Sequence, residues 1–201
     1  METGVSLDRA IQISLSNPLK RQVETIPLEE ARGRVTSVPL ASKVDDPRFD
    51  NSAMDGFAVR ASDCQNGGTI LRIIGTSKAG GERPPQVREG QACRIMTGAP
   101  LPQGADAIVM IEDTEVEGDN VSINGPARTG FIRWKAENLS VGQETLPSGV
   151  LLTSAAIALA GTMGHGEIEV ITRPKIAILS TGDELVRPGQ ELSPGQIYES
   201  N

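Results

Sequence analysis

The sequence predicts a mixed α+β protein that is rich in β-strand, and three observations support this prediction. The 201 residues include 22 Gly and 13 Pro, which favour many turns and short strands. Only 2% of the residues are aromatic, so the core must rest on Val, Ile, Leu, Ala and Met. Short apolar runs bounded by turn residues fill the middle of the chain, whereas helical periodicity is confined to short segments on either side. This length fits one large domain or two small ones.

The first segment has the pattern of an amphipathic helix. Ser6 is a suitable N-cap, apolar residues then recur at helical spacing to Leu15, and Asn17-Pro18 ends the pattern. A short helix is expected over 28–32, because Pro27 suits its first turn and Gly33 its C-terminal cap. A strand is expected over 35–44.

The segment from 45 to about 138 predicts an inserted, small β-barrel-like domain. Gly118-Asp119-Asn120 is a plausible hairpin turn between the last two strands. Several short strands at close spacing are typical of a small barrel or sandwich. The expected strands are Phe57–Arg60, Thr69–Thr76, Ala92–Met96, Ala107–Val116 and Asn120–Ile123.

The chain then returns to its first domain. A strand over 145–152 precedes a compact helix that Thr153 or Ser154 caps, and a further strand is expected over 168–172. We therefore predict a discontinuous N-terminal domain over 1–44 and 139–172, which encloses the inserted domain of 45–138.

A buried parallel strand is expected over 175–179 (KIAIL), followed by a glycine turn and a helix. This order is the opening of an α/β ligand-binding unit. The segment 173–201 is accordingly predicted to be the start of a truncated α/β domain.

Composition excludes several classes of function. The net charge of −7 argues against nucleic acid as a partner, because phosphate backbones require clustered Lys and Arg. Cys64 and Cys93 have neither a CxxC partner nor a nearby His, which excludes a structural zinc site within the chain. No apolar run has the length of a membrane span, and the N-terminus lacks a signal pattern, so we expect a cytoplasmic protein.

Three polar loops follow apolar runs and carry most of the chemistry, namely FDNSAMDG (49–56), RIMTGAP (94–100) and LSTGDEL (179–185). Each combines glycine with short hydroxyl or carboxylate side chains, such as Ser52 in the first. Glycine lets a backbone approach a ligand closely, and the side chains offer oxygens to a hard cation or an oxyanion. The chain has a single histidine, His165, which we interpret as a turn residue. The three polar loops therefore indicate a magnesium and phosphate site.

Each loop also has a purely structural interpretation. Asp55 either holds Mg²⁺ or forms part of an Asx turn closed by Gly56. Thr97 either binds a phosphate oxygen or ends a strand. Ser180, Thr181 and Gly182 either cradle an oxyanion or cap a helix, and the adjacent Asp183 fits an oxyanion only if a cation intervenes.

The block around Glu137 provides a further candidate site. Glu137 supplies an acidic group, and Arg133 and Lys135 are the basic groups best suited to face a phosphate from this half of the chain. The alternative is that these cations are solvated strand ends.

The same blocks carry a family resemblance. FDNSAMDGFAVR, RIMTGAPLPQGADAIVM and RPKIAILSTGDELVRPGQELSPGQIYESN resemble the signature stretches of the molybdopterin molybdenumtransferase family, which comprises bacterial MoeA and the E domain of gephyrin. The resemblance covers the chain from about Ser6 to Asn201, and family members are roughly twice this length. Where many relatives have Gly-Glu-Asp, this chain has Ala136-Glu137-Asn138, so a charge at position 138 is missing.

The resemblance implies an activity and its cofactor. The reaction is the Mg²⁺-dependent insertion of molybdenum, from molybdate, into adenylylated molybdopterin with release of AMP. It also implies a homodimer with an active site shared between subunits, and an upstream adenylyltransferase is a further candidate partner. The α/β segment would then be the start of a molybdopterin-binding domain, and the isolated chain is expected to be inactive.

The resemblance also assigns roles to individual residues. Asp55 and Asp183 would bind the metal, and Thr97 and Glu137 would join them in the catalytic site. Substrate binding is expected for Ser52, Ser180, Thr181 and Gly182. Two alternatives stay open, a gephyrin-type peptide-binding scaffold and a molybdate or tungstate sensor without catalysis.

Overall fold

The structure is a computed structural model that describes residues 4–16, 20–65 and 67–200. The chain divides into two compact units. The smaller is formed by Met1–Glu24 and Ile171–Asn201, and the larger by Thr25–Val170.

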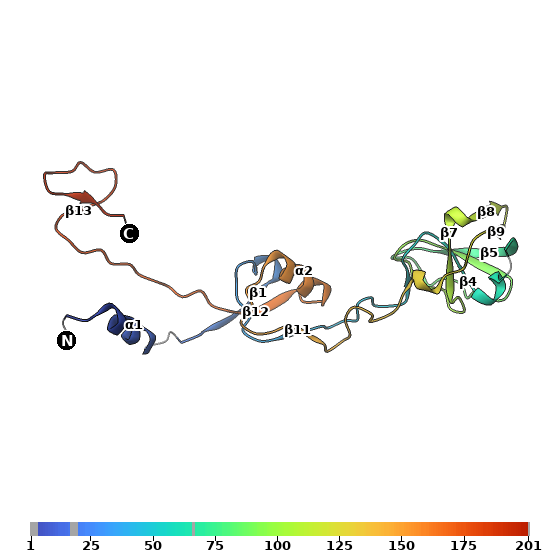
Figure 1. Cartoon of the computed structure of the whole chain (residues 1–201), viewed down its shortest axis with the longest axis horizontal. Coiled ribbons are helices and arrows are strands. Elements are labelled where there is room, and N and C mark those ends of the chain that lie inside the picture. The colour runs from blue at the N-terminus through green and yellow to red at the C-terminus, as the bar shows by residue number, and fades with distance from the viewer. Residues whose placement is uncertain (1–3, 17–19, 66, 201) are drawn as a thin grey trace. The chain divides into compact units, whose positions relative to one another are not determined.

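The smaller unit begins with the predicted amphipathic helix. Helix α1 spans Leu7–Ser16, and the Ser6 hydroxyl oxygen accepts a hydrogen bond from the Arg9 amide at 3.3 Å, which confirms the predicted N-cap (Figure 1). The predicted stop at Asn17-Pro18 lies outside the described residues. No residue of α1 is buried.

The strand predicted over 175–179 is wrong. This run is an irregular, exposed segment, in which Ile176 is 78% and Leu179 88% exposed. A buried parallel strand needs a hydrogen-bonded neighbour and covered faces, and in the described part of the chain no strand pairs with this run.

The helix predicted after this strand is also wrong. A turn closed by the Leu185 amide on the Gly182 carbonyl oxygen (3.2 Å) leads into the short strand β13 (Leu185–Val186). Strand β13 pairs in parallel with β14 (Ile197–Tyr198). Pro188 and Gly189 follow shortly after β13, and both residues disfavour a helix there.

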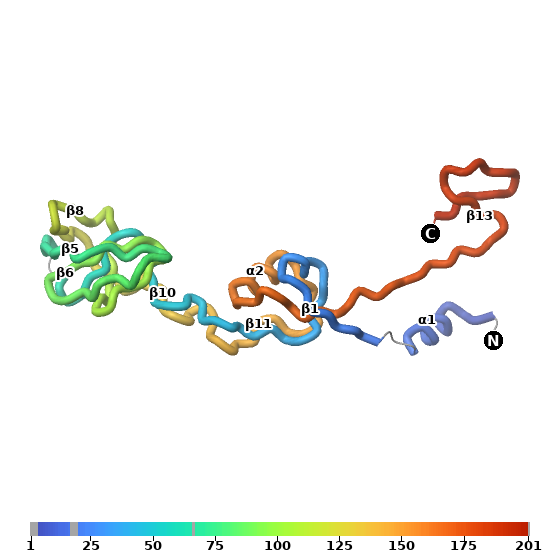
Figure 2. The backbone as a smooth tube through the Cα atoms, turned by 180° about the vertical axis from the view of Figure 1, so that it is seen from behind, coloured from blue at the N-terminus to red at the C-terminus, as the bar shows by residue number. Residues whose placement is uncertain are grey.

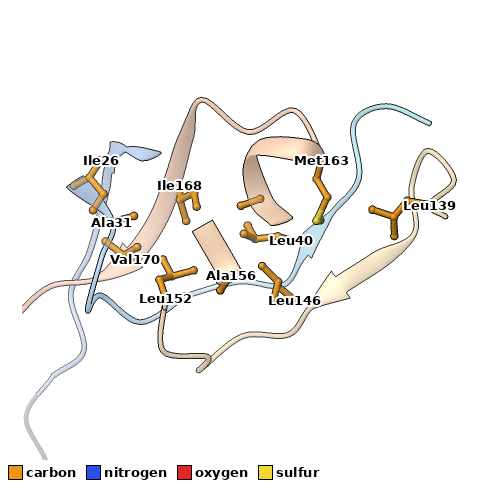
Figure 3. Packing of buried hydrophobic residues seen from close by; sticks show 11 residues of the cluster. Ile26, Ala31, Leu40, Leu139, Leu146, Leu152, Ala156, Met163, Ile168 and Val170 are labelled. Atoms are coloured by element: carbon orange, nitrogen blue, oxygen red, sulfur yellow. The ribbon is translucent and has the colours of Figure 1, made fainter. Parts of the chain in front are cut away.

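In the larger unit, one hydrophobic core lies between α2 (Ser154–Thr162) and short strands (Figure 3). Strand β1 (Val23–Pro27) pairs with β12 (Glu167–Ile171), and β2 (Leu40–Ala41) pairs antiparallel with β11 (Glu144–Leu146). The buried residues of this core are Ile26, Ala31, Leu40, Leu139, Leu146, Leu152, Ala156, Ala160, Met163, Ile168 and Val170.

Local details of this region follow the sequence in part. The Thr153 hydroxyl accepts from the Ala156 amide at 3.3 Å, so Thr153 is the predicted cap of α2. The helix expected over 28–32 is a single 3₁₀ turn, η1 (Leu28–Glu30). The strand expected over 35–44 is reduced to isolated bridges and β2, because Pro39 interrupts strand pairing.

A curled six-stranded sheet forms the second part of the larger unit (Figure 1). Its core includes Phe57, Val109 and Val121, all fully buried. The hairpin predicted at Gly118-Asp119 is confirmed, whereas the strand predicted over 107–116 is split by the 3₁₀ turn η3 (Ile111–Asp113). In spatial order the strands are β7 (Ala107–Met110), β4 (Gly56–Val59), β6 (Gln91–Ile95), β5 (Thr69–Ser77), β9 (Asn120–Ile123) and β8 (Thr114–Glu117).

Two antiparallel segments, 42–50 and 133–143, connect the two parts of the larger unit and run side by side (Figure 2). The Asp46 amide donates to the Leu139 carbonyl oxygen at 2.8 Å, and the Ala136 amide donates to the Pro47 carbonyl oxygen at 2.9 Å. Beside them β3 (Asn51–Ser52) pairs antiparallel with β10 (Ile132–Arg133).

The remaining short elements are the 3₁₀ turns η2 (Ala61–Cys64) and η4 (Thr129–Phe131). None of the helices in the described ranges has the length and apolar character needed to cross a membrane. The predicted class, mixed and rich in β-strand, is therefore confirmed, and the domain boundaries stay a prediction.

Candidate functional site

The curled sheet fixes the backbone of Asp55. This residue stands between β3 and β4, and its carbonyl oxygen accepts from the Ile111 amide at 3.1 Å. The next residue, Gly56, lies against the neighbouring strand β7 so closely that a Cβ atom there would overlap the Val109 carbonyl oxygen. Glycine is therefore required at position 56 by a close backbone approach.

The Asp55 carboxylate joins two of the three polar loops. Its Oδ1 atom accepts from the Thr97 amide at 2.7 Å and from the Thr97 hydroxyl at 3.0 Å. The Gly98 amide in turn donates to the Ser52 carbonyl oxygen at 2.8 Å, with Gly98 in the left-handed region at φ +77°. Residues 42 positions apart in the sequence thus form one site.

A hollow of about 200 Å³ opens beside this pair. The hydrogen bonds from the Thr97 amide and hydroxyl hold the pKa of the Asp55 carboxyl below its usual value, and the positive charge of Arg94 contributes in the same direction. The hollow is lined by Asp55, Gly56, Arg94, Ile95, Met96, Thr97 and Ile111.

Sequence reasoning missed Arg94 as a site residue. It lies on β6 between the buried Cys93 and Ile95, so strand alternation alone turns its side chain to the exposed face. The signal was available as a charged residue directly before the Thr-Gly turn of its motif.

Ser52 has a structural role in the described geometry. It is fully buried, and its hydroxyl donates to the Met54 carbonyl oxygen at 2.5 Å and accepts from the Met54 amide at 3.1 Å. These bonds shape the turn that leads to Asp55. A contact between Ser52 and a ligand stays a prediction.

Glu137 belongs to a different turn and is not among the described residues that line the Asp55 hollow. Its Oε2 atom accepts from the Trp134 amide at 2.9 Å. The neighbouring Asn138 donates through its side-chain amide to Asp46 Oδ2 at 3.0 Å. Glu137 and Asn138 therefore stabilise the connecting segments, and a catalytic role for Glu137 stays a prediction.

Lys135 and Arg133 flank the same turn. The Lys135 ammonium group forms an ion pair with Asp45 at 3.2 Å, and Arg133 is exposed at the end of β10. Asp45 thus partly neutralises the charge of Lys135, which the sequence had suggested as a group that faces a phosphate.

The third polar loop lies in the smaller unit. Thr181, Gly182 and Asp183 are exposed, and Ser180 is half-buried. A Cβ atom at Gly182 would overlap the Glu184 carboxylate, so glycine allows this side chain to fold back over the loop. The predicted roles of these residues in binding substrate and metal stay predictions.

The described ranges contain no group of three or more His, Cys, Asp or Glu side chains placed to hold a metal ion. Both cysteines are free, and burial raises the pKa of the Cys64 thiol to about 11. The ring of His165 lies in a turn, with Nε2 at 2.9 Å from the Ala41 carbonyl oxygen.

Comparison with known proteins shows the family and agrees with the overall fold. The family model described as MoeA N-terminal region (domain I and II) matches residues 5–164 of the chain. The chain belongs to the MoeA family. A solved MoeA relative, the molybdopterin biosynthesis MoeA protein from Pyrococcus horikosii, superposes with a TM-score of 0.83 at 35% sequence identity, covering 98% of this chain and 51% of that one.

Curated MoeA relatives carry the name molybdopterin molybdenumtransferase. One from Nostoc sp. is 40% identical over 187 residues, which are 90% of this chain and 43% of the relative. One from Haemophilus influenzae is 38% identical over 200 residues, which are 98% of this chain and 49% of the relative. The chain thus spans about half the length of the curated MoeA relatives it matches.

Proposed function

We propose that this chain is the N-terminal part of a molybdopterin molybdenumtransferase. The reaction would insert molybdenum, from molybdate, into adenylylated molybdopterin and release AMP. The observation that carries the proposal is the hydrogen-bonded pair of Asp55 and Thr97 beside Arg94, in a chain whose curated relatives bear that enzyme name.

Magnesium fits the donor set of this pair. Thr97 occupies Asp55 Oδ1, and among the described residues no hydrogen bond or ion pair engages Oδ2. Magnesium uses one or two protein carboxylates and fills its shell with water and substrate phosphate oxygens. When bound, the ion would neutralise charge on the pyrophosphate link of the substrate.

The protein groups have separate tasks in this proposal. Thr97 lowers the pKa of the Asp55 carboxyl and fixes its orientation through two hydrogen bonds. Arg94 offers a guanidinium to a phosphate oxygen in the same hollow. Positioning and charge neutralisation suffice for cleavage of a phosphoanhydride, so no protein nucleophile is required.

The proposal extends to groups outside this hollow. Asp183 is the second proposed metal ligand and Glu137 a further acidic group, and Ser180, Thr181 and Gly182 would contact substrate together with Ser52. The functional form is a cytoplasmic homodimer with a shared active site, supplied by an adenylyltransferase. In domain terms, 45–138 is a barrel-like insertion into a domain of 1–44 and 139–172, and 173–201 begins the molybdopterin-binding domain.

The test is the Asp55→Asn substitution in the full-length protein that carries this chain. AMP release and molybdenum insertion are measured with adenylylated molybdopterin and molybdate. We expect turnover to fall by about 100-fold or more, as it does when a charge-stabilising group is lost from an active site, with the oligomeric state retained.

Glu115→Gln is the matched control, because it also removes one carboxylate but lies on the exposed edge strand β8. It should leave turnover unchanged. Unaltered turnover in Asp55→Asn would refute the role of Asp55. A folded parent protein without any turnover would favour the scaffold or sensor alternatives.

A further inference from the structure

The two connecting segments line a second, open hollow, which shares no lining residue with the Asp55 hollow. Its volume is about 270 Å³, which is suited to a small ion with part of its hydration shell. Lys43, Val44, Asp45 and Arg48 line it from one segment, and Lys135 and Val141 line it from the other.

The charge of this hollow is opposite to that of the whole chain. Lys43, Arg48 and Lys135 contribute three cations against the one carboxylate of Asp45, in a chain with a net charge of −7. Within residues 4–16, 20–65 and 67–200, Lys135 is ion-paired with Asp45, whereas no side-chain partner is present for Lys43 or Arg48. Among the lining side chains the positive charges therefore exceed the negative ones by two, and a further carboxylate, that of Asp50, is bonded to the Lys135 backbone amide.

Hydrogen bonds fix the frame of the hollow. Asp45 Oδ1 accepts from the Val141 amide at 2.9 Å, and Asp45 Oδ2 lies 3.2 Å from the Lys135 ammonium group. The Lys135 amide donates to Asp50 Oδ1 at 2.8 Å, and Ala136 is bonded to the opposite segment through Pro47. The backbone of Lys135 is thus held in place, and its exposed ammonium group is paired with Asp45.

We propose that this hollow binds a tetrahedral oxyanion with two negative charges. Lysine presents three donors around a compact charge, and arginine presents a planar fork that matches two oxygens of a tetrahedral anion. The excess of two positive charges matches a dianion. Asp45 anchors Lys135 and at the same time weakens binding by repulsion, so the site is expected to release its ion readily.

Two sources share this chemistry, a metal oxyanion such as molybdate and a free inorganic phosphate. The proposal concerns binding by this chain and needs no turnover, so it can fail while the proposed enzymatic function stands. Equally, the proposed enzymatic function can fail while this binding proposal stands.

Isothermal titration calorimetry on the 201-residue chain provides the test. Sodium molybdate, sodium sulfate and sodium phosphate are titrated in turn, with sodium chloride as the reference. The ionic strength is kept constant, because salt screens exposed charges. We expect saturable binding of at least one of the three oxyanions and none of chloride.

Three variants locate the site. Arg48→Gln should weaken oxyanion binding by about tenfold, through the loss of a charge-assisted hydrogen bond. Asp45→Asn should tighten binding by about threefold, because it removes the repelling charge while the new amide oxygen still accepts from Val141. Lys78→Gln removes one exposed cation outside the hollow and should change nothing.

The strengthening in Asp45→Asn separates the proposal from simple damage to the fold, since a misfolded chain would not bind an anion more tightly. Selective binding of molybdate would identify a metal oxyanion as the ligand, and selective binding of phosphate would identify inorganic phosphate. Absence of saturable binding, or equal weakening in Arg48→Gln and Lys78→Gln, would overturn the proposal.

Discussion

Replacement of Ala136 by glycine should make the protein more stable. Among the described residues, Ala136 is the only one other than glycine with a positive φ, at +62°. The left-handed region costs a residue with a Cβ atom about 1–2 kcal/mol. Glycine removes this cost but adds about 0.5–1 kcal/mol of backbone entropy on folding. The difference predicts that Ala136→Gly gains about 0.5–1 kcal/mol.

The gain in the free energy of unfolding can be measured, because the substitution leaves the hydrogen bond of this residue unchanged. The hydrogen bond from the Ala136 backbone amide to the Pro47 carbonyl oxygen involves backbone atoms alone, so the variant retains it. Urea denaturation followed by circular dichroism would report the free energy of unfolding. In thermal unfolding, the midpoint should rise by about 2 °C for a chain of this size.

Ala79→Gly is the matched control. Ala79 is an exposed turn residue outside the positive-φ region, so the same substitution should lower the free energy of unfolding by about 0.5–1 kcal/mol. Opposite signs in the two variants are the expected result. A loss of stability in Ala136→Gly that equals the loss in Ala79→Gly would refute the reasoning.

Two further predictions concern the Asp55 hollow. Gly56→Ala should lower the free energy of unfolding in urea by about 3 kcal/mol or more, because the new methyl group meets backbone atoms that have no room to move. Thr97→Val should raise the pKa of Asp55 toward its usual value of 3.8, measured by NMR titration of the carboxyl carbon. A lowered pKa in the folded state stabilises the protein above pH 3.8, and this contribution is lost as the pH falls through the folded-state pKa. Any part of the stability deficit of Thr97→Val that arises from Asp55 should therefore be present at neutral pH and vanish in acid.

Both predictions have internal controls. Gly130 has open space around it and no positive φ, so Gly130→Ala should change stability by less than about 1 kcal/mol. Asp45 also has a lowered pKa, but its donors are Val141 and Lys135, so its titration should not move in Thr97→Val. An equal loss in the two glycine variants would contradict the first prediction, and an unchanged Asp55 pKa the second.

Local chemistry written in the sequence predicted several elements correctly. Ser6 and Thr153 cap α1 and α2, because a hydroxyl before an apolar helical pattern satisfies free amides at a helix start. The hairpin at Gly118 formed for a similar reason, since glycine accepts the positive φ of a tight turn. The three polar loops also stood out from the sequence, because their composition is unusual and their motifs are long.

Other features depended on contacts that the sequence does not display. The run 175–179 is apolar enough for a buried strand, yet it is irregular because a strand requires hydrogen-bonded neighbours. The role of Gly56 comes from the strand that lies against it, and Arg94 entered the site only when β6 placed it beside Asp55.

The sequence by itself determined the family, the caps, the turns and the identity of the polar loops, because these depend on residues close together in the chain. Only the tertiary structure decided that Thr97 hydrogen-bonds Asp55 and that two connecting segments line a hollow with more cations than carboxylates. These pairings join residues from about 40 to 90 positions apart. Strand order and register bring such residues together, and neither is encoded in any local window of the sequence.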